Sequence, residues 1–243
     1  LLKKADYEQE IDIDSDWELL IDPALVKVTP DSATKKIKYL LDCSMPLSSL
    51  ASGLYLLTCI RSENKVTVTI FATPVMPNPS AEALQANKIA AINLPANASL
   101  VLQPRCLAGI VQPKGRPIRI TRHWRIANLS SWLTLKLRYV VFHGPAQLIV
   151  KGNDGVNIGL AKSGVASNQS STLGFSANLR YAVSRSAPFY AYLSGKQQLF
   201  DDSFSSGTGF YIQEVTPKPW KGGLLSNPIP VIINTILKAF GLG

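Results

Sequence analysis

Apolar and polar residues alternate along most of the chain between residues 39 and 217. The alternation is regular in residues 66–70 (Val-Thr-Val-Thr-Ile) and in residues 173–183, where every second position is apolar. Because successive side chains of a strand point to opposite faces of a sheet, a period of two is typical of half-buried strands. Glycine, proline, asparagine and serine separate several such segments. The sequence therefore predicts an all-β fold, either a barrel-like sandwich or a double-stranded β-helix.

The charges are divided unevenly along the chain. Residues 1–34 hold nine acids and three bases, whereas residues 35–243 hold 22 bases and seven acids. We expect residues 1–38 to form an acidic N-terminal arm that lies against the basic body, binds a basic partner or keeps the chain soluble. A basic body attracts nucleic acid, an anionic membrane surface or an acidic protein, and charge alone does not choose among them.

Proline marks a boundary inside the chain. Three prolines in residues 74–79 remove backbone donors that a central strand needs. We therefore expect N-terminal strands and a proline-rich boundary in residues 39–79, a β-domain in residues 80–217, and a linker with a terminal helix in residues 218–243.

The last segment, residues 227–243, differs from the rest because its apolar residues follow a helical period. About 12 helical residues reach about 18 Å, which is too short to span a bilayer. We expect this helix to pack on its own domain, on a second copy, in a membrane interface or in a groove on a partner. The expected partner or membrane contacts are Val231, Ile232, Ile233, Ile236, Leu237 and Phe240.

Glycines punctuate the second half of the chain. Gly144 and Pro145 precede an aliphatic run that ends at residue 150, and Gly195, Gly207 and Gly209 precede the strand pattern of residues 210–213. We expect all of them to be structural turns between strands and not a ligand cradle, because turns need positive φ or close backbone approach.

These glycine-rich segments resemble the AIM24 family, whose members carry a double-stranded β-helix like that of the tryptophan RNA-binding attenuator protein. The resemblance covers about residues 80–217, and it departs from the family pattern at residues 196–198 (Lys-Gln-Gln). It implies the attenuator-like fold and β-helix domains that can associate. It also implies a role near a membrane, because eukaryotic members are linked to the organisation of the mitochondrial inner membrane.

The residues that carry chemistry are few. The two histidines, His123 and His143, have no metal-ligand spacing with each other or with Cys106. No Gly-x-Ser-x-Gly elbow is present. Asp201 and Asp202 form the only adjacent acid pair of the body, and we expect them in a turn. The three cysteines are expected to be reduced and buried. The sequence predicts no enzyme, no cofactor and no metal site.

We therefore expect a non-enzymatic structural or scaffolding subunit that docks on a larger, membrane-associated protein assembly. Its partners are proteins of that complex, an anionic membrane surface, or both, and a homo-oligomer is possible. The expected place is the periphery of a membrane, on the bacterial cytoplasmic side or in an organelle, without a transmembrane helix in this chain. The alternative is an RNA-binding oligomer that uses the basic body of an attenuator-like fold.

Overall fold

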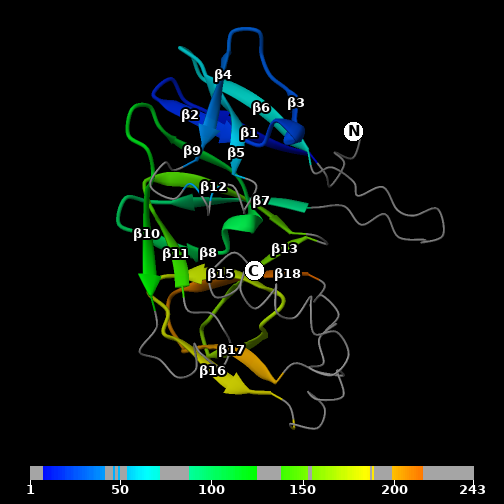
Figure 1. The fold of residues 1–243 in the computed structure, drawn as a ribbon, viewed down its shortest axis with the longest axis vertical. Helices are drawn as coiled ribbons and strands as arrows, with labels where there is room; N and C mark the ends of the chain where they lie inside the picture. Colours follow the sequence, from blue (N-terminus) through cyan, green and yellow to red (C-terminus); the bar gives the residue numbers. More distant parts are fainter. Residues whose placement is uncertain are drawn as a thin grey trace, which may run out of the picture. The chain divides into compact units, whose positions relative to one another are not determined.

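Strands dominate the structure, a computed structural model (Figure 1). Its described residues form 18 strands. It describes residues 8–41, 46, 49, 54–71, 88–124, 138–152, 155–186, 188 and 199–215. In these ranges the helical positions are two short 3-10 turns, Pro23–Leu25 and Pro104–Cys106, and the single residues 46 and 49. The predicted all-β class is confirmed. The helix expected in residues 227–243 lies outside the described residues.

The chain divides into two units. The first consists of Leu1–Ala98, Pro104–Ile120 and Phe142–Val156. The second consists of Ser99–Gln103, Thr121–Val141 and Asn157–Gly243.

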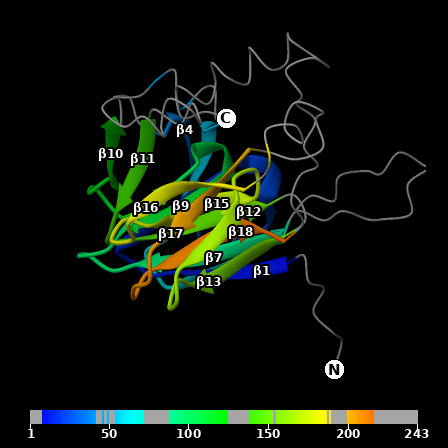
Figure 2. The ribbon, with the colours of Figure 1, turned by 90° about the horizontal axis from the view of Figure 1, so that it is seen from below.

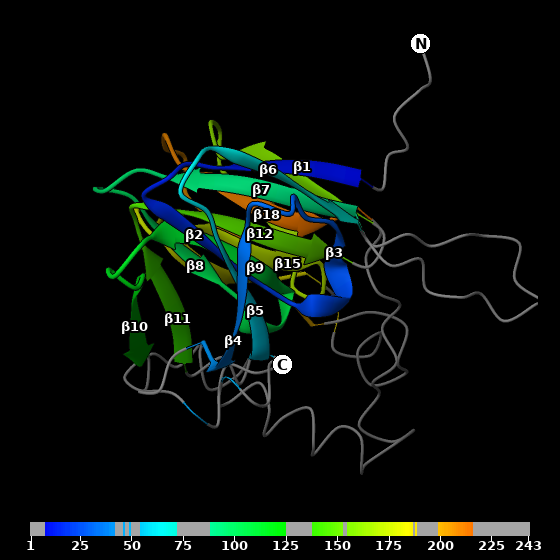
Figure 3. The same ribbon diagram turned by 90° about the horizontal axis from the view of Figure 1, so that it is seen from above.

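The first unit contains two antiparallel sheets. A three-stranded sheet has the order β1 (Glu8–Ile13), β6 (Val66–Phe71), β3 (Val26–Val28). A six-stranded sheet has the order β4 (Thr34–Leu40), β5 (Tyr55–Arg61), β2 (Trp17–Ile21), β9 (Leu107–Pro113), β12 (Ala146–Gly152), β7 (Lys88–Leu94). Figure 3 shows β1 and β6 side by side, as their antiparallel register requires.

Both sheets of the first unit contribute to one apolar core. In β6 Val66, Val68 and Ile70 are buried while Thr67 is exposed, as the alternation predicts. Burial of this apolar area is the main force that holds the two sheets together. The buried residues of this core are Ile11, Ile13, Leu19, Ile21, Leu25, Ile60, Val66, Val68, Ile70, Ala108, Val111 and Ile149.

The expectation of an acidic arm in residues 1–38 is wrong for residues 8–38, because these residues form strands β1 to β4. Ile11 and Ile13 of β1 lie in the core, and Asp12 between them lies on the outer face. There the Thr67 hydroxyl donates a hydrogen bond of 2.7 Å to Asp12, and Lys65 lies 3.4 Å from the same carboxylate. Acids at alternate positions of a strand leave its other face free for burial. The division into residues 39–79, 80–217 and 218–243 stays a prediction.

The second unit also contains two sheets. The larger has the order β10 (Arg119–Trp124), β11 (Arg138–His143), β8 (Ser99–Leu102), β15 (Thr172–Ser176), β18 (Phe210–Glu214), β13 (Val156–Leu160). The smaller has the order β14 (Val165–Asn168), β17 (Phe200–Phe204), β16 (Tyr181–Arg185). Figure 2 shows β16 and β17 as neighbours. A small core in this unit is formed by Ala161, Phe175, Leu179 and Phe204.

Gly144 lies in the turn between β11 and β12, where the backbone of another segment comes very close. A Cβ at this position would overlap the carbonyl oxygen of Pro95 and lie 2.6 Å from that of Leu94. The Gly144 amide donates a hydrogen bond of 3.0 Å to the carbonyl oxygen of Ala98. This position therefore needs glycine for space.

We predict that Gly144→Ala lowers the free energy of unfolding by about 1–3 kcal/mol, because the added methyl group must push backbone atoms apart. Gly207→Ala is the matched control, since its Cβ would meet only Leu179 at 3.4 Å, an ordinary contact. Urea unfolding followed by circular dichroism measures both variants. Equal stability losses in the two would contradict the steric role of Gly144.

Candidate functional site

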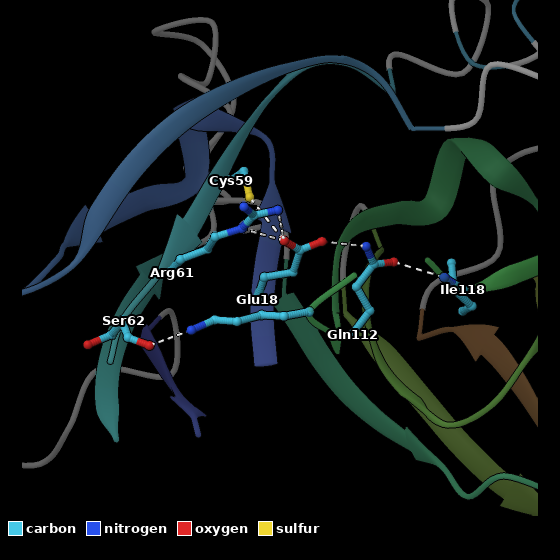
Figure 4. A network of polar contacts seen from close by, with 7 residues as sticks. Glu18, Cys59, Arg61, Ser62, Gln112 and Ile118 are labelled. Carbon is cyan, nitrogen blue, oxygen red and sulfur yellow. Dashed lines mark hydrogen bonds and ion pairs between the residues drawn. The ribbon is translucent and has the colours of Figure 1, made fainter. Parts of the chain in front are cut away.

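A cluster of polar side chains is buried around Glu18 in the first unit (Figure 4). Glu18 lies on β2, opposite Arg61 of β5 on one side and Gln112 of β9 on the other. The neighbouring residue Leu19 points into the apolar core, so Glu18 points to the opposite face of the sheet. Only 4% of Glu18 is exposed, and burial of a carboxylate requires strong partners.

Both oxygens of the Glu18 carboxylate have such partners. The Nε of Arg61 donates a hydrogen bond of 2.6 Å to Oε2, and Nη2 of the same guanidinium lies 2.5 Å from that oxygen. The Gln112 amide donates a hydrogen bond of 2.7 Å to Oε1, and its own oxygen accepts one of 3.0 Å from the Ile118 amide. The Cys59 thiol lies 3.6 Å from Oε2 as a further donor. The network joins three neighbouring strands and the segment after β9.

These contacts decide the charge of the carboxyl group. Burial by itself would raise the pKa of Glu18, but the hydrogen bonds from Gln112 and Arg61 and the positive charge of Arg61 outweigh it, so the pKa is lowered. Glu18 is therefore an anion near neutral pH. A carboxylate that is buried and held by three donors serves as a structural link, because a general base needs a free lone pair directed at its substrate.

The Cys59 thiol belongs to the same cluster but is not activated. Burial and the negative charge of Glu18 raise its pKa. Since the thiolate is the nucleophile, this environment suppresses cysteine chemistry. Cys59 and Cys106 are both buried, as expected, and neither forms a disulfide, whereas Cys43 lies outside the described residues.

A second buried acid lies in the second unit. Asp202 is 0% exposed on β17, between β14 and β16. The Tyr181 hydroxyl donates a hydrogen bond of 2.7 Å to Oδ1 of Asp202, and the Gln169 amide lies 3.5 Å from the same oxygen. Burial and the negative charge of Asp202 raise the pKa of Tyr181. The expected turn at Asp201 and Asp202 is wrong, because both lie inside a strand.

Tyr181, the donor to this buried acid, belongs to a group of aromatic rings that pack on one another. The rings of Phe175 and Tyr181 are stacked with centroids 5.2 Å apart, and those of Phe204 and Tyr211 are stacked at 5.9 Å. Tyr139 meets Tyr181 edge to face at 5.6 Å. Rings in mutual contact fill a core. Their faces are occupied by one another, so they do not form an aromatic cage for a cation.

The structure places some of the residues that the sequence singles out, and it does not bring them together. Gly144 and Pro145 lie between β11 and β12 in the first unit, whereas Gly207 and Gly209 lie between β17 and β18 in the second. The structure gives their positions between strands, and their roles as structural turns stay predictions. The remaining residues lie outside the described part of the chain: Gly195, Val231, Ile232, Ile233, Ile236, Leu237 and Phe240.

The described residues contain neither a candidate metal site nor a candidate membrane-spanning helix. Within them, no group of three or more histidine, cysteine, aspartate and glutamate side chains is placed to hold a metal ion. In the same part of the chain, no helix has the length and apolar character needed to cross a membrane.

The arrangement defines an all-β protein with two units, each built of antiparallel sheets and each stabilised by a buried acid with its own donors. No family model matches the sequence, and no curated protein matches it. Among solved structures, the fold is similar to the crystal structure of protein SPYM3_0169 from Streptococcus pyogenes, with a TM-score of 0.54 and 11% identity. The similarity covers 98% of this chain and 96% of that chain, and it shows the fold alone.

We predict that Glu18→Gln lowers the free energy of unfolding near neutral pH by about 1–3 kcal/mol, because the neutral amide loses charge-assisted hydrogen bonds. The folded-state pKa of Glu18 lies below its ordinary value of 4.5, so its contribution is present above about pH 4.5 and is lost as the pH falls through the lower folded-state pKa. Urea unfolding over this pH range should show the two proteins converging in acid.

Asp12→Asn is the matched control for Glu18→Gln, because Asp12 makes an exposed ion pair with Lys65. Exposed pairs contribute little, so this variant should unfold close to the wild type. A Glu18→Gln variant as stable as the wild type at neutral pH would overturn the structural role of the network.

The raised pKa of Cys59 predicts slow alkylation in the folded protein. Iodoacetamide labelling, followed by mass spectrometry of the peptide that contains Cys59, should show much slower modification in buffer than in urea at the same pH. Equal rates in the two conditions would mean that the thiol is accessible and reactive in the folded state.

Proposed function

We propose that the protein is a non-enzymatic structural subunit that docks on a larger, membrane-associated protein assembly. The observation that carries the proposal is the exposed ribbon formed by β4 and β5. In this ribbon Ile37 is 67% exposed and Tyr39 is 74% exposed, and Tyr55 and Leu56 on β5 are also exposed. Neighbouring apolar side chains on a surface mark interaction sites more often than single ones do.

The buried polar groups support a structural role over an enzymatic one. Glu18 and Asp202, two buried acids, accept hydrogen bonds from side chains of their own unit. A catalytic carboxylate needs access to a substrate, and neither of these has it. The described residues thus offer a surface for contact and no reactive group at that surface.

The membrane part of the proposal rests on charge and on the resemblance to the AIM24 family. Residues 35–243 carry 22 bases against seven acids, which favours an environment rich in anionic lipid or in acidic protein. The likeness to the streptococcal protein adds support for the fold and none for the partner.

The test measures binding of the full chain to native membranes, to membranes shaved with protease and to protein-free anionic liposomes. We expect the protein to co-sediment with native membranes of its source organism, and to lose most of this binding when the membranes are first shaved with protease. Binding to protein-free anionic liposomes should be weak.

Two outcomes would overturn the proposal. One is the absence of any binding to native membranes. The other is tight binding to RNA that falls steeply with salt, which would favour the RNA-binding oligomer instead, since phosphate contacts release counterions. Equal binding to shaved and untreated membranes would mean that the protein binds lipid and not a protein assembly.

A further inference from the structure

β4 is the last strand of the six-stranded sheet (Figure 3). It pairs with β5 over its seven residues, and among the described residues no strand pairs with its other edge. An edge strand presents backbone amides and carbonyls that another strand can bind. β4 contains neither proline nor glycine, so its backbone is able to continue the sheet.

The two faces of β4 carry different chemistry. Lys36 is opposite Cys59 and Lys38 is opposite Leu57, so these two lysines share the face of the Glu18 network. Ile37 and Tyr39 lie on the other face, which is also the face of Ile60 in the apolar core. Lys35 is opposite Ile60 and so shares the face of Ile37 and Tyr39, whereas Leu40 shares the face of Lys36 and Lys38. One face of β4 therefore carries two lysines, and the other carries the two exposed apolar residues and one lysine.

This arrangement distinguishes among possible occupants. A membrane surface would contact one face of the ribbon, and it would leave either Lys36 and Lys38 or Ile37 and Tyr39 on the other face without a contact. A second copy pairing antiparallel through β4 would bring lysine opposite lysine around Ile37, and like charges directly opposite each other are destabilising. Lysines are also common protectors of edge strands, but protection does not explain Ile37 and Tyr39, which are exposed on the same strand.

We infer that β4 binds an extended segment of a protein partner in which acidic and aliphatic residues alternate, so that the segment adds a strand to the sheet. Its backbone pairs with the open edge of β4, its acids lie beside Lys36 and Lys38, and its aliphatic side chains cover Ile37 and Tyr39. The inference rests on the proposed docking function and names the chemistry of the partner.

The first experiment uses peptide probes as long as β4, seven residues, with acetylated and amidated ends. One probe alternates valine and glutamate, a second alternates valine and lysine, and a third has the composition of the first with its glutamates in one block. Fluorescence anisotropy should show saturable binding of the first probe to the full chain and little binding of the other two. Hydrogen exchange of the amides in residues 34–40 should slow when the first probe binds, because strand addition protects the edge.

Charge reversal provides the decisive variant. Lys36→Glu with Lys38→Glu should weaken binding of the glutamate probe by about tenfold or more, because two attractive cross-strand pairs become repulsive. The same variant should gain binding of the lysine probe. Lys162→Glu is the matched control, since Lys162 is an exposed lysine of a turn outside β4. Circular dichroism verifies that all variants remain folded.

Failure of this inference is distinguishable from failure of the proposed function. If the double variant still docks on native membranes as well as the wild type, the docking function stands and β4 is not its site. Lysine-dependent binding to protein-free anionic liposomes would make lipid the occupant. If the wild type is a dimer in light scattering, and the double variant strengthens or abolishes that dimer, then a second copy of the chain binds the edge of β4. Each of these results overturns the added strand.

Discussion

The buried carboxylate of Glu18, with its donors Arg61 and Gln112, fixes the register of three strands in the first unit. An anion in a sheet interior is tolerated only where its donors are in place, and removal of one partner leaves an uncompensated charge. A slip of β2 by one residue would turn Glu18 toward the apolar core in place of Leu19. Because β4 takes its own register from β5, the same constraint decides which side chains of β4 face each side of the sheet.

The alternating pattern of the sequence was sufficient to predict strands, and it was most informative where composition was misleading. Residues 66–70 lie in β6, as predicted. Residues 173–183, predicted as one strand, form β15 and β16 of two different sheets with a turn between them, because alternation alone does not mark the turn. The N-terminal acids suggested an arm because charge was summed over a segment without regard to position. Asp12 lies between Ile11 and Ile13, so one strand has both an acidic outer face and a buried inner face.

The polar networks could not be predicted, because their members are far apart in the chain. Glu18 and Arg61 are 43 residues apart, and Tyr181 and Asp202 are 21 residues apart. Sequence spacing carries no signal for such pairs until strand order is known, and strand order depends on the packing of the whole unit. The only local hint was an acid in the otherwise apolar segment Trp17–Ile21. The edge position of β4 was hidden for the same reason, although its lysines and apolar residues were visible from the start.

The contrast between the interior and the edge bears on function. In the two units Glu18 and Asp202 accept hydrogen bonds from donors of their own unit, as buried carboxylates require. β4 breaks the corresponding rule for edges, because it leaves Ile37 and Tyr39 in water where polar residues would protect an isolated strand. Sequences depart from local rules chiefly where another requirement prevails. Contact with an acidic partner segment, as proposed for β4, is a requirement of that kind, and it would favour lysine over glutamate at positions 36 and 38.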